Sequence, residues 1–155
     1  MSERRVISVI VSNEHGVLTR ITGLFAARGY NIETLTVAPI PDSKYSRLTI
    51  VTSGSPRVIE QIIKQLHKLI PVYKVIEHEE LIEKEMVLAK IPLGERLADV
   101  EALCKAYNGS IVNVGKDGII VMVADEPKRV KNFVHALSTF APKEIIRGGV
   151  VAIER

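Results

Sequence analysis

The pattern of hydrophobic and polar residues along the first part of the chain changes from continuous apolar runs to a spacing of three and four residues. This change predicts the order of strands and helices. Residues 4–12 (RRVISVIVS) are β-branched and apolar on both faces, which is typical of a strand at the centre of a sheet. Residues 17–28 carry apolar side chains three and four positions apart, the spacing of an amphipathic helix. Gly29 stands where a helix commonly ends in a left-handed residue. Residues 32–40 then predict a second strand.

The pattern continues with a strand, a helix and a strand. Residues 46–53 alternate apolar and polar side chains, which predicts a half-exposed third strand. Ser55 and Pro56 are the residue types that favour the cap and the first position of a helix. Pro71 ends that helix, and residues 72–80 predict a fourth strand. This β-α-β-β-α-β order is typical of a ferredoxin-like unit, in which both helices cover one face of a four-stranded antiparallel sheet.

The second half repeats this order less regularly. It predicts a strand, a helix, a hairpin that turns at Lys116-Asp117, a second helix that starts near Pro127, and a last strand with a bend at Gly148-Gly149; these elements cover residues 85–91, 97–107, 110–125, 127–140 and 144–154. We therefore predict an α+β fold of two ferredoxin-like βαββαβ units. The expected domains are 1–80 and 81–155, with the acidic segment 79–85 as the linker.

Composition excludes several classes of protein. The chain has 155 residues, of which 46% are hydrophobic and 25% are charged, which is typical of a globular protein. No apolar run reaches the roughly 18 residues of a membrane span, so we expect no membrane contact. The start of the chain does not resemble a secretory signal and Cys104 is the single cysteine, so we expect a cytoplasmic location. A net charge of +3 and strands without base-stacking aromatics give no reason to expect a nucleic-acid partner.

No catalytic signature is present in the sequence. It contains no GxSxG, no GxGxxG and no Walker loop, and its four histidines, at positions 15, 67, 78 and 135, lack the spacing of a metal pair. Cys104 falls on the apolar stripe of a predicted helix, so we interpret it as a small buried hydrophobe. The residues therefore propose no enzyme activity, although they do not exclude one, and they indicate no metal site and no cofactor in this chain.

The segment between the first strand and the first helix is the candidate binding site. It reads NEHG, from Asn13 to Gly16, and it leads into a helix N-terminus, where unpaired N–H groups and a positive dipole end favour an anion. Gly16 allows a carboxylate to approach, Asn13 offers an acceptor for an ammonium group, and Val17 and Leu18 offer an apolar wall. The pattern suits a free amino acid with an apolar side chain. The alternative is that Asn13 only caps the helix and Gly16 only turns the chain.

The stretch NEHGVLTRITGLFAARGYNIETLTVAP, residues 13–39, resembles the ACT-domain segment of the acetolactate synthase (acetohydroxyacid synthase) regulatory, or small, subunit. The segments SRLTIVTSG, IEQIIKQLHKLIPVYKV and EKEMVLAKI are also similar to that family. The resemblance covers the whole length. It is specific over the first eighty residues, whereas after about residue 92 it rests on element order and length.

The resemblance implies a noncatalytic chain whose first domain is an ACT domain. Its partner would be a large catalytic subunit that uses thiamine diphosphate, Mg²⁺ and FAD in valine, leucine and isoleucine biosynthesis. The small subunit would raise the activity of that enzyme and confer feedback inhibition by a branched-chain amino acid, which in this family is usually valine. The rival hypothesis is a free-standing ACT-type amino-acid sensor that acts on another client protein.

The resemblance also implies where the effector binds. ACT domains of this family form a homodimer side by side, with the effector at the interface. The loop after the first strand of one chain would face the start of the second strand of the other. Asn13, Gly16, Val17 and Leu18 would then line one side of the pocket, and Asn31 and Ile32 of a second copy would line the other side.

Overall fold

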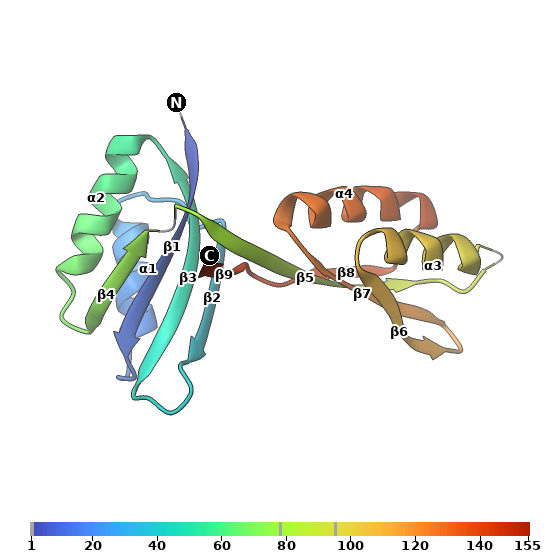
Figure 1. The fold of residues 1–155 in the computed structure, drawn as a ribbon, viewed down its shortest axis with the longest axis horizontal. Coiled ribbons are helices and arrows are strands. Elements are labelled where there is room, and N and C mark those ends of the chain that lie inside the picture. Colours follow the sequence, from blue (N-terminus) through green and yellow to red (C-terminus); the bar gives the residue numbers. More distant parts are fainter. Residues whose placement is uncertain (1, 78, 95) are drawn as a thin grey trace. The chain divides into compact units, whose positions relative to one another are not determined.

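The computed structural model describes residues 2–77, 79–94 and 96–155, and its chain divides into two compact units. The first unit comprises residues 1–81 and 152–155, and the second comprises residues 82–151. Each unit contains an antiparallel sheet with two helices (Figure 1), so the predicted α+β class with two ferredoxin-like units is confirmed. The last four residues lie with the first unit, whereas the sequence boundaries placed them with the second.

The first unit has a four-stranded sheet in the order β2-β3-β1-β4, with antiparallel pairing throughout. This order places β1 at the centre, as predicted, and leaves β2 at an edge. The elements are β1 (Glu3–Ser12), α1 (Val17–Ala27), β2 (Thr34–Pro39), β3 (Tyr45–Gly54), α2 (Pro56–His67) and β4 (Val72–Glu77). The second strand thus starts at Thr34, two residues later than predicted, because Ile32 and Glu33 belong to the loop after α1.

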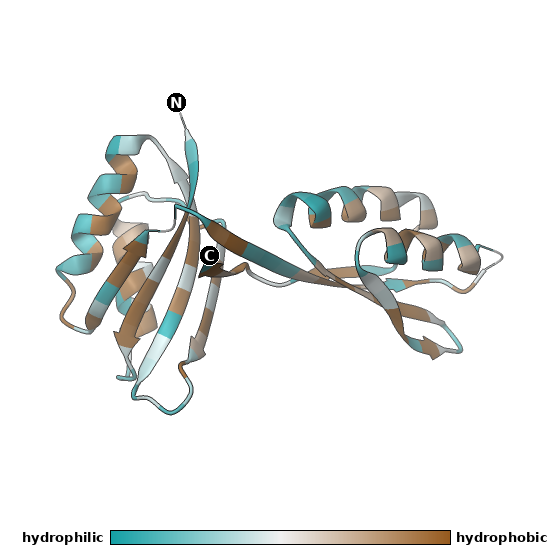
Figure 2. Ribbon diagram, in the orientation of Figure 1, coloured by the Kyte–Doolittle hydropathy of each residue, from teal (hydrophilic) through white to brown (hydrophobic). Residues whose placement is uncertain are grey.

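The core of the first unit lies between the sheet and its two helices. Phe25 of α1 and Leu66 of α2 are almost fully buried against β1 residues such as Val9. Figure 2 shows hydrophobic and hydrophilic residues alternating along α2, as expected for a helix that covers a sheet. Strand β3 was predicted to be half-exposed, and this is wrong, because residues 48–52 are all buried and so both faces of the strand are covered at these positions.

Two local signals of the sequence are confirmed in the first unit. The Ser55 Oγ accepts a hydrogen bond from the N–H of Val58 at 3.3 Å, so Ser55 caps α2 with Pro56 at its first turn. Gly29 has a φ of 67° and follows the end of α1 in the left-handed conformation that its position predicted.

The second unit has the sheet order β6-β7-β5-β8, and β9 also pairs with β5. Its elements are β5 (Leu81–Ile91), α3 (Leu97–Ala106), β6 (Gly109–Gly115), β7 (Gly118–Asp125), α4 (Pro127–Leu137), a 3-10 turn (Ser138–Phe140) and β8 (Glu144–Arg147). Strand β9 (Val151–Glu154) begins at the end of this unit, and its residues 152–154 belong to the first unit. The predicted hairpin is confirmed, since Gly115 pairs with Gly118 across the turn. The predicted linker is wrong in part, because β5 already starts at Leu81. The predicted last strand is two strands, β8 and β9, separated at Gly148-Gly149.

The second core forms between the helices and the inner face of its sheet. Phe133 and Cys104 are fully buried there, so Cys104 has the role of a small hydrophobe that its position predicted. Burial, together with the nearby charge of Glu101, raises the pKa of the Cys104 thiol, which disfavours the reactive thiolate. Among the described residues, no helix combines the length and the apolar character that crossing a membrane requires.

Candidate functional site

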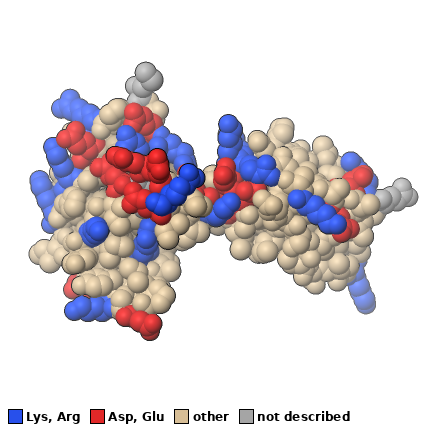
Figure 3. Space-filling model, in the orientation of Figure 1, with Lys and Arg blue, Asp and Glu red and all other residues tan. Residues whose placement is uncertain are grey.

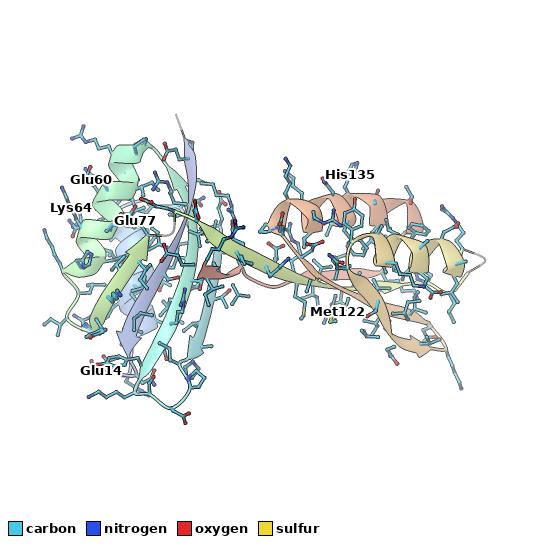
Figure 4. All side chains as sticks on the ribbon, viewed as in Figure 1. Glu14, Glu60, Lys64, Glu77, Met122 and His135 are labelled. Carbon is cyan, nitrogen blue, oxygen red and sulfur yellow. The ribbon has the colours of Figure 1, made fainter. Side chains whose placement is uncertain are left out.

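The candidate site lies at the start of α1, in the loop after β1, where Figure 4 labels Glu14. The loop is fixed by two backbone hydrogen bonds, from the Asn13 N–H to the Lys44 carbonyl at 3.1 Å and from the Glu14 N–H to the Ser12 carbonyl at 2.8 Å. Gly16 is the N-cap residue, with φ 77° and ψ 5°. Asn13 therefore does not cap α1, and the alternative interpretation of this asparagine is wrong.

The first turn of α1 has no side chain that satisfies its N–H groups. The structure gives α1 no side-chain cap and no acidic residue in its first turn, and the first backbone bond runs from the Arg20 N–H to the Gly16 carbonyl at 3.0 Å. A Cβ added to Gly16 would meet no atom within 4 Å, so the space beside this turn is open. Free N–H groups and the positive end of the helix dipole suit a small anion such as a carboxylate.

The side chain of Asn13 is held by a neighbouring strand. The Ser46 hydroxyl on β3 donates a hydrogen bond to Asn13 Oδ1, which fixes the amide next to the start of α1. An amide oxygen accepts two hydrogen bonds, so one acceptor position of Oδ1 and the two donors of Nδ2 remain for a ligand. Sequence reasoning missed Ser46. The signal that identifies it is the antiparallel register of β1 and β3, which pairs Ser46 with Val11 close to Asn13.

Val17 and Leu18 differ in what they offer to a ligand. The Val17 side chain is 6% exposed and belongs to the core, whereas Leu18 is 42% exposed. Of the apolar wall that the sequence predicted, Leu18 therefore supplies the accessible side chain, and Val17 contributes its backbone at the helix start.

Asn31 and Ile32 lie beyond the other end of α1. Asn31 is exposed, and its carbonyl accepts a hydrogen bond from the Thr52 hydroxyl, while Ile32 is half-buried against the core. The 11 residues of α1 span about 16 Å at 1.5 Å per residue, which separates these two residues from Gly16. One copy of the chain thus brings Asn13, Gly16 and Leu18 together but leaves Asn31 and Ile32 apart from them.

A groove of about 290 Å³ lies elsewhere in the first unit, between α2 and the sheet edge at β4. Its charged groups already pair with one another, Arg5 with Glu77 at 3.3 Å and Lys64 with Glu60 at 3.1 Å. Figure 4 labels Glu60, Lys64 and Glu77 on this side of the unit. A ligand would have to displace these ion pairs, so the start of α1 is the better candidate site.

Charge adds little to the choice of partner. Figure 3 shows basic and acidic residues interspersed on the visible face of each unit. A surface of mixed sign gives no strong electrostatic steering toward a polyanion. Recognition at the start of α1 therefore rests on local hydrogen bonds and on the helix dipole.

Comparison with known proteins agrees with this fold. The family model for the AHAS small subunit-like ACT domain matches residues 7–74, and the model for the small subunit of acetolactate synthase matches residues 84–155. The first unit is thus an ACT domain within a two-domain regulatory subunit.

Relatives extend over nearly the whole chain. The acetolactate synthase small subunit of Haemophilus influenzae is 40% identical over 98% of this chain and 96% of its own length. The probable acetolactate synthase small subunit of Archaeoglobus fulgidus is 38% identical over 98% of this chain and 97% of its own. The crystal structure of the acetolactate synthase small subunit from Thermotoga maritima matches with a TM-score of 0.91 at 33% identity, covering 99% of this chain and 98% of that one. The chain belongs to the family of acetolactate synthase small subunits.

Proposed function

We propose that this chain raises the activity of an acetolactate synthase catalytic subunit and makes it sensitive to feedback by a branched-chain amino acid, with valine as the first candidate. The observation that carries the proposal is the start of α1, where a left-handed glycine without a side-chain cap leaves N–H groups facing open space. Family membership supports the catalytic subunit as the partner. Thiamine diphosphate, Mg²⁺ and FAD would then belong to that subunit, and both proteins would act in the cytoplasm.

The effector pocket would form between two copies of the ACT domain. Strand β2 is an edge of its sheet, and an edge strand has unpaired backbone groups that a second copy can cover. The Thr36 hydroxyl on β2 is buried and has no hydrogen-bond partner among the described residues. This edge strand therefore also carries a buried hydroxyl whose hydrogen bonds are unsatisfied. A two-fold dimer would bring Asn31 and Ile32 of one copy toward Asn13 and Gly16 of the other.

Each part of the effector has a partner in this arrangement. The carboxylate would accept hydrogen bonds from the N–H groups of residues 16–18. The ammonium would donate to the remaining acceptor of Asn13 Oδ1 and to Asn31 of the second copy. Leu18 would contact the apolar side chain of the effector, which is why a branched-chain amino acid fits better than a polar one.

A charge placed at Gly16 tests the pocket. Gly16→Asp puts a carboxylate where the carboxylate of the effector would bind, and aspartate tolerates the left-handed conformation better than most residues. We expect valine binding, measured by isothermal titration calorimetry, to weaken at least a hundredfold, because the two like charges repel. Stimulation of the catalytic subunit should remain, because the substitution does not alter the core.

The matched control is Gly94→Asp, which adds the same charge in open space before the first helix of the second unit. It should leave the affinity for valine as in the parent chain. Equal affinity in the parent and both variants would refute the pocket. Failure of the parent chain to stimulate purified catalytic subunit in acetolactate formation would refute the proposed function itself.

A further inference from the structure

The last residues of the chain return to the first unit. The chain passes between the units twice, after residue 81 and again after residue 151, so residues 152–155 form a second covalent connection to the ACT domain. Figure 1 draws the C-terminus beside the strands of the first unit. These four residues are called the C-terminal strap below.

The strap is fixed to the first unit by directed hydrogen bonds. Arg47 Nη2, on β3, donates to the Ala152 carbonyl at 3.0 Å. The Arg155 N–H donates to the Glu80 carbonyl at 3.0 Å. Ala152 is 8% exposed, although it lies only three residues from the end of the chain. Two hydrogen bonds and a buried side chain therefore hold the strap in place on the first unit.

Arg47 connects the strap to the centre of the sheet. The same Nη2 atom also donates to the Ser8 hydroxyl at 2.9 Å, and Ser8, on the central strand β1, is fully buried. Ile7 and Val9, on either side of Ser8, face the helices, so Ser8 faces the opposite side of the sheet. A planar guanidinium is suited to joining two acceptors in a fixed geometry, which the flexible point charge of a lysine does less well.

The anchor is also next to the candidate effector site. Ser46 precedes Arg47 on β3, and its hydroxyl holds Asn13. The backbone carbonyl of Lys44, two residues before Ser46, accepts a hydrogen bond from the Asn13 N–H at 3.1 Å. Residues 44–47, at the start of β3, therefore contact the effector loop through Lys44 and Ser46 and contact the strap through Arg47. A shift of this segment on effector binding would act on both.

We propose that Arg47 locks the C-terminal strap onto the ACT sheet, and that the strap carries the effector-bound state of the first unit into the second unit. This inference rests on the proposed function for its effector, but the lock itself needs no effector. Arg47 is a positioning residue here, because it acts through the strap and not on the ligand.

The lock is tested in the full chain without effector or catalytic subunit. Arg47→Gln should raise the hydrogen-exchange rate of the backbone amides of residues 152–155 about tenfold or more, because a charge-assisted hydrogen bond to Ala152 is lost. Arg47→Lys keeps the charge and should shift exchange less in the same direction. The matched control is Arg57→Gln, an equal charge change at an exposed position of α2, which should leave these rates unchanged. Equal exchange in the parent and both Arg47 variants would overturn the lock.

The coupling is tested in the complex with purified catalytic subunit. Arg47→Gln should bind valine with close to the parent affinity and should stimulate the enzyme fully. The maximal inhibition by valine should nevertheless fall clearly below that of the parent, because the strap no longer transmits the effector-bound state. Inhibition equal to that of the parent would overturn the coupling. A parent chain that shows no inhibition by any branched-chain amino acid would refute the proposed effector response and the coupling together, while the exchange measurement would still decide the lock.

Discussion

The first helix begins differently in the two units, although both follow the first strand of a βαββαβ fold. Helix α1 starts at Gly16 with no side-chain cap and no acid in its first turn. Helix α3 starts at Arg96 and has Asp99 in its first turn, with the Arg96 Nε donating to Asp99 Oδ2 at 3.5 Å. At the start of α3 the carboxylate of Asp99 stabilises the positive end of the helix dipole. At the start of α1 no such carboxylate is present in the first turn, so a bound anion could take this place.

The residues around α3 strengthen this difference. The Arg96 Nη1 donates to the Thr139 carbonyl at 3.3 Å, and its guanidinium lies 4.4 Å from the centre of the Phe140 ring. Arg96 thereby connects the start of α3 to the 3-10 turn that follows α4. The same fold therefore supports an open helix start in one unit and an occupied one in the other, because function depends on loop residues and not on the fold.

Glycine also serves different purposes in the two units. The left-handed Gly16 has open space where a Cβ would be, whereas a Cβ on Gly118 would lie 2.4 Å from the Ile91 carbonyl oxygen. Gly109 is similarly enclosed, with Val123 Cγ2 at 2.5 Å. Gly109 and Gly118 in the second unit thus permit close packing of backbone, and Gly16 in the first unit leaves room for a ligand.

Substitution of these glycines gives the largest expected effect. Gly118→Ala should lower the free energy of unfolding by about 3 kcal/mol, for two reasons. The new Cβ would clash with the backbone of Ile91, and the φ of 153° at position 118 suits only glycine. Gly16→Ala should cost only about 1 kcal/mol, since its φ is unfavourable but no atom is near. Urea unfolding followed by circular dichroism measures both. Equal losses would show that the two glycines do not differ in the way described here.

The next largest effect on stability is expected at Asp125, a buried carboxylate of the second unit that pairs with partly exposed basic side chains. Asp125 is 2% exposed and accepts hydrogen bonds from Arg129 Nε at 2.6 Å and from the Glu126 N–H at 2.8 Å. Burial alone raises the pKa of Asp125, but the hydrogen bonds of Arg129 and Glu126 and the charges of Arg129 and Lys84 bring it below its usual value. Asp125→Asn should lower stability by about 2 kcal/mol at neutral pH.

The sign of the pH dependence follows from the lowered pKa. The ionised Asp125 stabilises the folded state fully above the unfolded pKa of about 4, and this contribution is lost as the pH falls through the lower folded pKa. Asp125→Asn should therefore weaken the loss of stability between about pH 4 and the folded pKa, measured by unfolding at a series of pH values. Asp117→Asn, at an exposed turn of the same unit, is the control and should retain the parent's dependence. If Asp125→Asn lost stability at acid pH as steeply as the parent, the ionised Asp125 would not stabilise the fold as described.

The smallest effect concerns the acid at the start of α3. Asp99→Ala removes the carboxylate that complements the helix dipole and should lower the free energy of unfolding by about 0.3–1 kcal/mol. Differential scanning calorimetry measures this loss. Because Asp99 lies outside the candidate site, valine affinity should not change, and a weaker affinity would break the assignment of effector binding to the first unit alone.

Local sequence signals predicted much of this molecule. A run of β-branched apolar residues predicted β1, and apolar residues three and four positions apart predicted α1 and α2. The Ser55-Pro56 pair and Gly29 predicted helix ends, because caps and periodicity are properties of neighbouring residues. The same kind of signal indicated Gly16 as a position where backbone N–H groups stay accessible. Element order then predicted two ferredoxin-like units.

Only the tertiary structure decided which residues meet across the sheet. Alternation along β3 predicted an exposed face, but residues 48–52 are buried on both faces of the strand. The hydrogen bonds from Ser46 to Asn13 and from Arg47 to Ala152 join residues 33 and 105 positions apart. Such contacts depend on strand register and on the return of the chain terminus, which no local window of sequence contains. The sequence by itself therefore determined the elements and the open helix start, and the packing of distant strands decided how that helix start is supported and to what it is connected.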